Sequence, residues 1–403
     1  MANTLKFGNG QWATKEGSTL AYNSENGNFK PLPFNFERST GATRVNKDGL
    51  IEVVSNNEPR IDFKDNTKGA LLLEPSRSNL FTYSEAINQG SWAKSNASII
   101  EDTTISPNGI QSAETFSITS NFGFFYKAPS LASGTTVTQS IFVKNIDADR
   151  INLQVRTAST AGLASFFFTN SEITNVQLTN GISADFDNYG NGWYRVYLTC
   201  TTTETNQLFR FQLNQSGMSC YVWGAQLEEG SYATSYIPTS GQSGGVTRVG
   251  ESTVNNLSNQ VSLTEGVFYI DVTNLGRSQN ANILTQNSAV NSVYGYIQTN
   301  DKIVFGLFAN SVSIPITSSL GYTIGARTKI AFHYKSGNSK LYVNGSLAGN
   351  STDTFTIGSG FADAIRLIDN SSAYVAFPEK STVNEFKVYN TGLTDQELIA
   401  LTS

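Results

Sequence analysis

Apolar side chains occupy every second position in three short runs of this sequence, and that alternation constrains the fold more than any other feature. The runs are residues 193–200, 208–213 and 220–225. A period of two places successive side chains on opposite faces of a strand, so each run predicts a half-buried β-strand. Turn-forming residues separate them, among them the Asn-Gln-Ser-Gly cluster at 214–217. Residues 192–239 are therefore predicted to end an antiparallel meander.

Similar runs recur along most of the chain and predict an all-β protein. We expect two antiparallel β-sandwich (jelly-roll) domains in tandem, after an extended N-terminal attachment region. The predicted segments are a connecting region at 1–79 with a β-hairpin near 42–54, a jelly roll at 80–239, a Gly/Ser linker at 240–252 and a second sandwich at 253–403. One short helix is predicted at the C-terminal end, because Thr394 and Glu397 have the spacing of a capping box.

Composition narrows the classes of function. Charged residues make up 15% of the 403 residues, the net charge is −5, and Lys and Arg form no run. Nucleic acid is therefore not an expected partner, because phosphate binding needs a clustered basic face. The first residues lack the apolar core of a signal peptide, and no apolar run approaches the ~20 residues of a membrane-spanning helix, so neither secretion nor membrane insertion is expected.

Several phrases in the first two thirds of the chain resemble segments of virion structural proteins of tailed bacteriophages, of the tail fibre or head fibre type. They are ATRVNKDGLIEVV, NEPRIDF, GALLLEPSRSNL and YVWGAQLEEGSYATSYIPT. The segment from 92 to 238 resembles the jelly-roll carbohydrate-binding modules of such proteins. The resemblance implies location in the virion after synthesis in the host cytoplasm, and attachment to other virion proteins through the N-terminal region. It also implies contact with host surface polysaccharide and a homo-oligomer, for which we expect a trimer.

The C-terminal part resembles concanavalin A-like and laminin G-like lectin domains. The matching pieces are KIAFHYKSGNSKLYVNGSLAG at 329–349 and VNEFKVYNTGLTDQELIAL at 383–401. In that family the first piece is a hairpin, and the second is the last strand followed by a short helix. The calcium ligands of the family have no counterpart here.

Aromatic side chains are the candidate ligand-binding residues, because an aromatic ring can stack on a sugar. Tyr294 and Tyr296 share one face of a predicted strand, and Trp223 is a third candidate, with Trp193 and Tyr221 as further alternatives. Core packing is the competing interpretation, since large aromatic residues usually serve it.

No catalytic residue, metal ligand or cofactor is predicted. His333 lacks the partners of a catalytic triad or zinc site and is expected on the solvated face of a strand. The adjacent carboxylates Glu228 and Glu229 point to opposite faces of an extended segment, so they cannot flank one glycosidic bond. Calcium at the Asp-rich turns 147–149 or 185–188 stays an alternative, but neither matches a calcium loop. Cys200 and Cys220 are either two buried thiols or a bridge.

Four functional interpretations remain open from the sequence. The first is a virion appendage or fibre subunit that contacts host glycans. The second is a capsid decoration or head fibre protein that binds no sugar. The third is a polysaccharide depolymerase, which the missing carboxylate pair disfavours. The fourth is a free lectin or adhesin, which the missing secretion signal disfavours.

Overall fold

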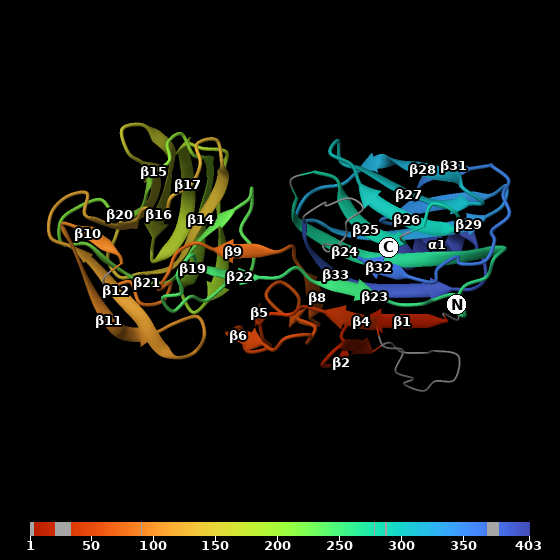
Figure 1. The fold of residues 1–403 in the computed structure, drawn as a ribbon, viewed down its shortest axis with the longest axis horizontal. Coiled ribbons are helices and arrows are strands. Elements are labelled where there is room, and N and C mark those ends of the chain that lie inside the picture. Colours follow the sequence, from red (N-terminus) through yellow and green to blue (C-terminus); the bar gives the residue numbers. More distant parts are fainter. Residues whose placement is uncertain (1–3, 21–33, 90, 278, 287, 369–378) are drawn as a thin grey trace. The chain divides into compact units, whose positions relative to one another are not determined.

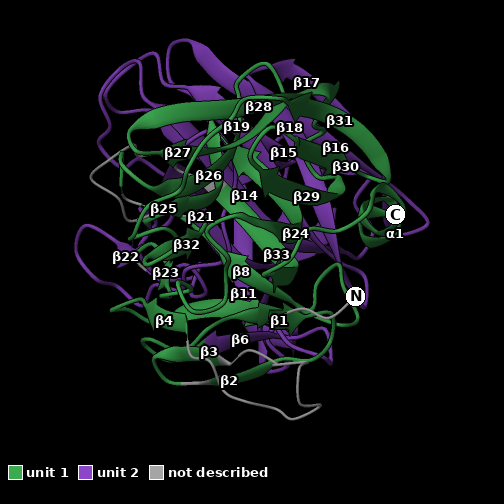
Figure 2. Cartoon of the chain, turned by 90° about the vertical axis from the view of Figure 1, so that its right-hand side faces the viewer, with its two compact units in different colours: residues 1–44, 54–76, 249–403 green, residues 45–53, 77–248 purple. Residues whose placement is uncertain are grey.

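The computed structural model describes residues 4–20, 34–89, 91–277, 279–286, 288–368 and 379–403. The chain divides into two compact units, coloured separately in Figure 2. Unit 1 comprises residues 1–44, 54–76 and 249–403, and unit 2 comprises residues 45–53 and 77–248. The elements are antiparallel strands and one short C-terminal helix, which confirms the predicted all-β class. Within the described ranges, no helix is long and apolar enough to cross a membrane.

Unit 2 contains two six-stranded antiparallel sheets (Figure 1). In spatial order, the first consists of β10 (Ala93–Ser95), β13 (Phe124–Lys127), β20 (Leu208–Leu213), β15 (Arg150–Arg156), β16 (Thr160–Thr169) and β17 (Glu172–Asn180). The second consists of β11 (Ala97–Ile105), β12 (Gln111–Ile118), β21 (Ser219–Glu229), β14 (Thr136–Asn145), β19 (Trp193–Thr201) and β18 (Ser183–Gly190). Phe211 and Val196 of the two sheets belong to one hydrophobic core. The three strands predicted over 193–225 are present as β19, β20 and β21, but the predicted meander is wrong. β20 belongs to the first sheet, and β14 lies between β21 and β19 in the second, so consecutive strands alternate between the two sheets.

Two further sheets have two strands each. β9 (Arg77–Asn79) pairs with β22 (Val246–Arg248). β5 (Ala42–Val45) and β6 (Ile51–Val54) form a two-stranded sheet at the position of the hairpin expected near 42–54. Its turn contains Gly49 at φ +78°, a backbone conformation that favours glycine, and Asn46 Oδ1 accepts hydrogen bonds from the backbone N–H groups of Asp48 and Leu50.

Unit 1 is built from an eight-stranded and a five-stranded sheet around its own core, with a small four-stranded sheet beside them. Along its main path, the eight-stranded sheet consists of β31 (Ser346–Ser351), β30 (Ser339–Val343), β29 (Arg327–Lys335), β24 (Glu265–Arg277), β33 (Glu379–Tyr389), β8 (Ala70–Leu73) and β7 (Ile61–Asp62), and β1 (Leu5–Gly8) also pairs with β33. The five-stranded sheet consists of β28 (Val312–Gly321), β27 (Lys302–Ala309), β26 (Ser292–Ile297), β25 (Ala281–Gln286) and β32 (Ile365–Leu367). The small sheet consists of β2 (Ala13–Lys15), β3 (Ser18–Leu20), β4 (Phe34–Glu37) and β23 (Ser252–Val254).

Strands of the first 76 residues complete the sheets of unit 1. β1 and β8 both pair with β33, which lies near the other end of the chain, and β4 pairs with β23. Leu5 and Phe7 of β1 are buried in the same core as Phe386. The compact units therefore have other boundaries than the segments expected from the sequence, because pairing between distant strands leaves no local signal.

A network of buried charges joins these N-terminal strands to the segment around residue 251. Glu251 Oε1 lies 2.5 Å from Arg60 Nη2 and 3.3 Å from Arg38 Nη1, and its Oε2 accepts a hydrogen bond from the Glu74 backbone N–H. Arg60 Nη1 also lies 3.0 Å from Glu74 Oε2. All four side chains are inaccessible to solvent. Each buried charge thus has an opposite charge within reach, which buried ions require.

The helix α1 (Asp395–Thr402) has the predicted capping box. Thr394 Oγ1 accepts a hydrogen bond from the Glu397 N–H, and a Glu397 carboxylate oxygen accepts one from the Thr394 N–H. Leu398 and Leu401 pack with Tyr269 and Tyr389 on the outward face of the eight-stranded sheet. That packing stabilises a helix too short to persist alone.

Candidate functional site

Three half-buried aromatic rings lie on the outward face of the five-stranded sheet in unit 1. They belong to Tyr294, Tyr296 and Phe308 and are called the aromatic strip below. On β26, Val293 and Ile297 point into the core, and Tyr294 and Tyr296 alternate with them. The period of two therefore turns both tyrosines away from the core, as the sequence predicted.

The rings of the aromatic strip lie close together. The Tyr294 and Tyr296 centroids are 6.3 Å apart with 30° between the ring planes, and the Tyr294 and Phe308 centroids are 5.4 Å apart. Tyr294 Oη lies 2.9 Å from Ser313 Oγ of β28, the strand beyond β27. Burial raises the pKa of the Tyr294 phenol, so its hydroxyl stays protonated at neutral pH. An apolar platform with hydroxyls at its edge suits a sugar ring, which has apolar faces and a polar rim.

The third candidate, Trp223, lies in unit 2 and is 1% exposed. Its ring contacts Phe142, at a centroid distance of 5.3 Å, and Tyr236, at 4.7 Å. Val45 and Ile51 of the hairpin belong to the same buried cluster. Trp223 therefore serves core packing, the competing interpretation from the sequence, and its ring does not reach the surface. Trp193 is likewise buried in this cluster.

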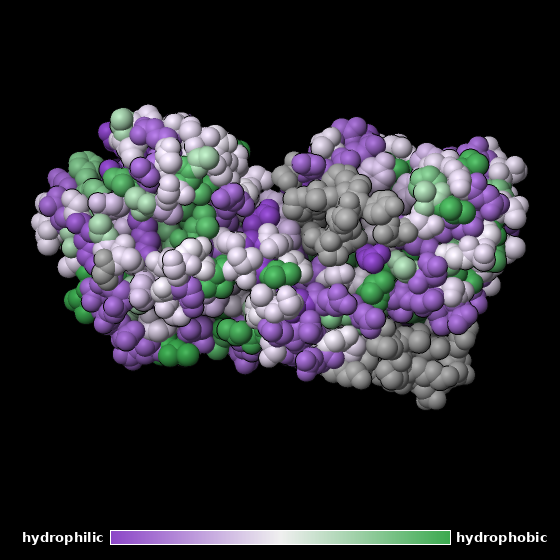
Figure 3. Space-filling view, viewed as in Figure 1, coloured by the Kyte–Doolittle hydropathy of each residue, from purple (hydrophilic) through white to green (hydrophobic). Residues whose placement is uncertain are grey.

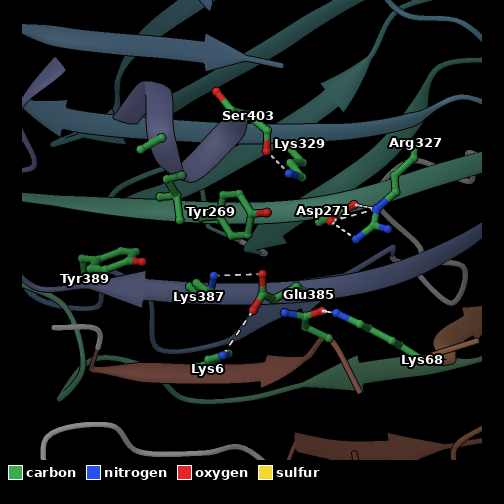
Figure 4. A pocket seen from close by; sticks show the side chains of 13 residues that line it. Lys6, Lys68, Tyr269, Asp271, Arg327, Lys329, Glu385, Lys387, Tyr389 and Ser403 are labelled. Carbon is green, nitrogen blue, oxygen red and sulfur yellow. Dashed lines mark hydrogen bonds and ion pairs between the residues drawn. The ribbon is translucent and has the colours of Figure 1, made fainter. Parts of the chain in front are cut away.

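A hollow that the sequence analysis did not identify lies on the outward face of the eight-stranded sheet, beside α1 (Figure 4). We call it the cationic pocket; its volume is about 650 Å³. Tyr269 and Asp271 of β24 line it together with Glu385, Lys387 and Tyr389 of β33. Its other charged lining residues are Lys6, Lys68, Arg327 and Lys329.

Strand alternation explains this lining. Phe268 and Ile270 of β24, and Phe386 of β33, point into the core, so Tyr269 and Glu385 next to them point outward. Each strand alone shows only an ordinary alternation of polar and apolar residues. The pocket could not be predicted because it depends on which strands are neighbours.

Ion pairs organise the cationic pocket. Arg327 donates hydrogen bonds to Asp271, with Nε 2.8 Å from Oδ1 and Nη2 2.6 Å from Oδ2. Lys387 Nζ lies 2.8 Å from Glu385 Oε2, and Lys6 Nζ lies 3.4 Å from Glu385 Oε1. These contacts use both side-chain carboxylates among the described lining residues.

Two phenol groups add neutral hydrogen-bond donors to the pocket. Burial raises the pKa of Tyr389 to about 12 and also raises that of Tyr269, so both hydroxyls remain protonated. Lys387 Nζ lies 4.9 Å from the centroid of the Tyr269 ring, within the range of a cation–π contact.

The structure brings no catalytic set together from the residues considered in the sequence analysis. Glu228 is buried and accepts a hydrogen bond from the Thr234 N–H, whereas Glu229 is exposed, so the two carboxylates are separated as predicted. His333 is on the outward face of β29 but only 5% exposed, so the prediction that it is solvated is wrong. The loop at Gly392 lies over it: a Cβ at Gly392 would come within 2.9 Å of His333 Nε2.

Both Asp-rich segments hold hydrogen bonds of the backbone, but residues 185–188 lie within β18, so the prediction of a turn there is wrong. Asp147 accepts one from the Ser219 N–H, and Asp185 accepts one from the Phe186 N–H. Across the part of the chain that the structure describes, no group of three or more His, Cys, Asp or Glu residues is placed to hold a metal ion.

Comparison with known proteins gives similarity at the level of structure alone. No family model matches the chain, and no curated protein matches it. Among solved structures, the Ruminococcus gnavus IT-sialidase CBM40 bound to α2,3-sialyllactose is similar, with a TM-score of 0.31 and 18% identity. That match covers 35% of this chain and 84% of the module.

Botulinum neurotoxin structures are also similar. A type C structure, from work on its interaction with two ganglioside molecules, has a TM-score of 0.32 and 14% identity, covering 38% of this chain. The serotype D ligand-binding domain in complex with N-acetylneuraminic acid has a TM-score of 0.30 and 15% identity, covering 37% of this chain. The chain spans 39% of the length of each of these two neurotoxin structures. At these scores the similarities establish neither a family nor a ligand for the chain.

Proposed function

We propose that this chain is a non-catalytic protein that contacts glycans, with the aromatic strip of unit 1 as the sugar-stacking surface. The observation that carries the proposal is the pair Tyr294 and Tyr296, both half-buried, with ring centroids 6.3 Å apart on one strand of a packed sheet. Because β26 lies between β25 and β27 in its sheet, the rings are held on a rigid element, so stacking on a sugar costs little ordering of the protein.

The phage-like phrases of the sequence support a location for this activity. We propose a virion appendage or fibre subunit that meets host surface glycans. Single stacking contacts are weak, so several copies on one particle would be needed for useful avidity. Two predictions come from the resemblance alone: attachment to other virion proteins through residues 1–79, and assembly as a homo-trimer. A capsid decoration protein stays the alternative to an appendage or fibre subunit.

Glycan-array screening followed by titration tests the stacking surface. The array includes neutral, uronic and sialylated glycans. Replacing Tyr296 or Tyr294 by Ala removes one ring, and we expect affinity to fall about 2- to 10-fold for each, because an aromatic contact contributes about 0.5–1.5 kcal/mol.

Unit 2 offers a matched control. Tyr126 is also half-buried on the outward side of a strand and lies next to another ring, Phe124, at a centroid distance of 5.7 Å. Tyr126→Ala should leave binding unchanged. Loss of binding in Tyr126→Ala with normal binding in Tyr296→Ala would assign the sugar to unit 2 and overturn the proposed surface. No binding across the array would overturn glycan contact and favour a purely structural role.

The location is tested separately. Labelling assembled particles with antibodies to this protein and viewing them by electron microscopy should mark the tail or its fibres. Labelling confined to the capsid lattice would favour the decoration alternative.

A further inference from the structure

We propose that the cationic pocket of unit 1 binds an acidic sugar, with the carboxylate held by the cationic side chains. This inference goes beyond the proposed function, since the pocket is on the opposite sheet of the unit from the aromatic strip. It stands whether or not the strip binds a sugar.

The charge balance of the pocket favours an anion. Five cationic residues line it, namely Lys6, Lys68, Arg327, Lys329 and Lys387, against the two carboxylates of Asp271 and Glu385. Among the side chains, five minus two leaves an excess of three positive charges, of which Lys329 donates to the main-chain oxygen of Ser403, in a chain whose net charge is −5. Positive charge gathered around one hollow, against the overall sign of the chain, raises the local concentration of anions.

The position of the cations shows where an anion would bind. Arg327 is held by Asp271, and Lys387 by Glu385, on the neighbouring strands β24 and β33. Arg327 and Lys329 extend from β29, and Lys6 extends from β1, on either side of these two strands. Together with Lys387 of β33, positive groups therefore face the hollow from three strands (Figure 4). An anion in the hollow would be within reach of cations from more than one strand.

The remaining lining favours a polyhydroxylated anion over a bare phosphate. The two carboxylates accept hydrogen bonds from hydroxyl groups, whereas they would repel a doubly charged phosphate. The phenols of Tyr269 and Tyr389 can donate to ring or hydroxyl oxygens, and Ala400 and Leu401 of α1 offer a small apolar contact. The volume of about 650 Å³ is within the usual range for sites of small molecules.

Titration with D-glucuronate and D-glucose tests the proposal on the full chain. The two sugars share a ring and differ at C6, where one carries a carboxylate. We expect saturable glucuronate binding, followed by calorimetry or by NMR of the ligand, with glucose at least tenfold weaker. Binding should weaken as salt rises, because a charge contact is screened.

The double variant Lys6→Gln with Lys329→Gln removes two cations and leaves the Arg327–Asp271 and Lys387–Glu385 pairs intact. We expect it to weaken glucuronate binding at least fivefold. Lys302→Gln is the control: Lys302 belongs to the five-stranded sheet and, like Lys329, donates to a backbone carbonyl. This control should bind glucuronate as the parent chain does. An unchanged circular dichroism spectrum and melting temperature show that each variant is folded.

Glu385→Gln tests the charge argument in the opposite direction, because it makes the pocket more positive. It removes a carboxylate from the pocket and releases Lys6 and Lys387 from their partner, so we expect glucuronate to bind at least twofold more tightly. A loss of affinity in this variant, with the fold intact, would contradict the charge argument.

The remaining outcomes separate this proposal from the previous one. Glucuronate binding abolished by Tyr296→Ala but unaffected by the Lys6/Lys329 variant would overturn the pocket while supporting glycan contact. Inorganic phosphate binding as tightly as glucuronate and displacing it would mean an anion site without preference for sugar acids, which also overturns the proposal. Absence of glucuronate binding at millimolar concentration overturns it outright, whatever the glycan array shows.

Discussion

The ring of Tyr294 lies directly over Gly306 of the neighbouring strand. A Cβ atom on Gly306 would be 2.6 Å from Tyr294 Oη and 2.7 Å from its Cζ. The two residues are paired in register between β26 and β27. Because Gly306 has no side chain, the Tyr294 ring can lie against the backbone at this position.

Gly306→Ala should displace that ring. The added methyl group would also meet the Ile314 backbone oxygen at 2.6 Å, and that oxygen, unlike the ring, cannot move without a shift of β28. We expect a loss of about 1–3 kcal/mol in the free energy of unfolding and weaker sugar binding, as for Tyr294→Ala. Gly321→Ala is the control, because nothing lies within 4 Å of the position of its Cβ. Equal stability of the two variants in urea unfolding would contradict this packing.

The strands and faces of this fold follow closely from the sequence. The alternation in 208–213 predicts β20 with Phe209, Phe211 and Leu213 buried, and the structure has all three in the core. The capping box at Thr394 marks the start of α1. Both signals are local, because they depend on residues a few positions apart.

The features that could not be predicted from the sequence depend on contacts between distant segments. Alternation places Trp223 on the outward face of its strand, but Val45 and Ile51, far away in the sequence, belong to the cluster that buries it. Likewise, the polar side chains of the cationic pocket gather only because β24, β29 and β33 are neighbours. Burial and site formation at these places are properties of the topology.

Glu251 is predicted to be indispensable for the stability of unit 1. Glu251→Ala would remove the carboxylate that faces both Arg38 and Arg60 and leave those guanidinium groups short of a buried partner. We expect a loss of about 3–5 kcal/mol, the usual cost of breaking a buried ion pair from one side. Calorimetry should show a lower melting temperature in the unfolding transition of unit 1 alone, since the two units have separate hydrophobic cores. Glu37→Ala, at an exposed position of β4, should change stability by no more than about 0.5 kcal/mol.

The two cysteines should be inert in the native protein. Cys200 and Cys220 are free, fully buried thiols. Burial raises the pKa of Cys200 to about 12 and raises that of Cys220 as well, so neither forms the reactive thiolate near neutral pH. A thiol reagent such as DTNB should titrate no thiol in the native chain and both after denaturation without reductant. Fewer than two thiols after denaturation would indicate a bridge.

Acidification should destabilise unit 1 through His333. Burial lowers the pKa of this imidazole below its ordinary 6.5; Glu265 and Asp395 oppose that shift, and Lys340 and Lys335 reinforce it. Because the pKa of His333 is lower in the folded chain than in the unfolded chain, the unfolded chain takes up the proton first as the pH falls below about 6.5. The stabilising contribution of the neutral ring is therefore complete above that pH and is lost as the pH falls.

The slope of this loss can reach about 1.4 kcal/mol per pH unit for one proton. Urea unfolding between pH 7.5 and 5.5 measures it, and His333→Gln, which carries no titrating group, should have a flatter profile. The difference in unfolding free energy between the parent chain and the variant should then shrink as the pH falls. A difference that stays constant across this range would mean that His333 titrates alike in the folded and unfolded chains, and that its burial beneath the loop at Gly392 does not hold in solution.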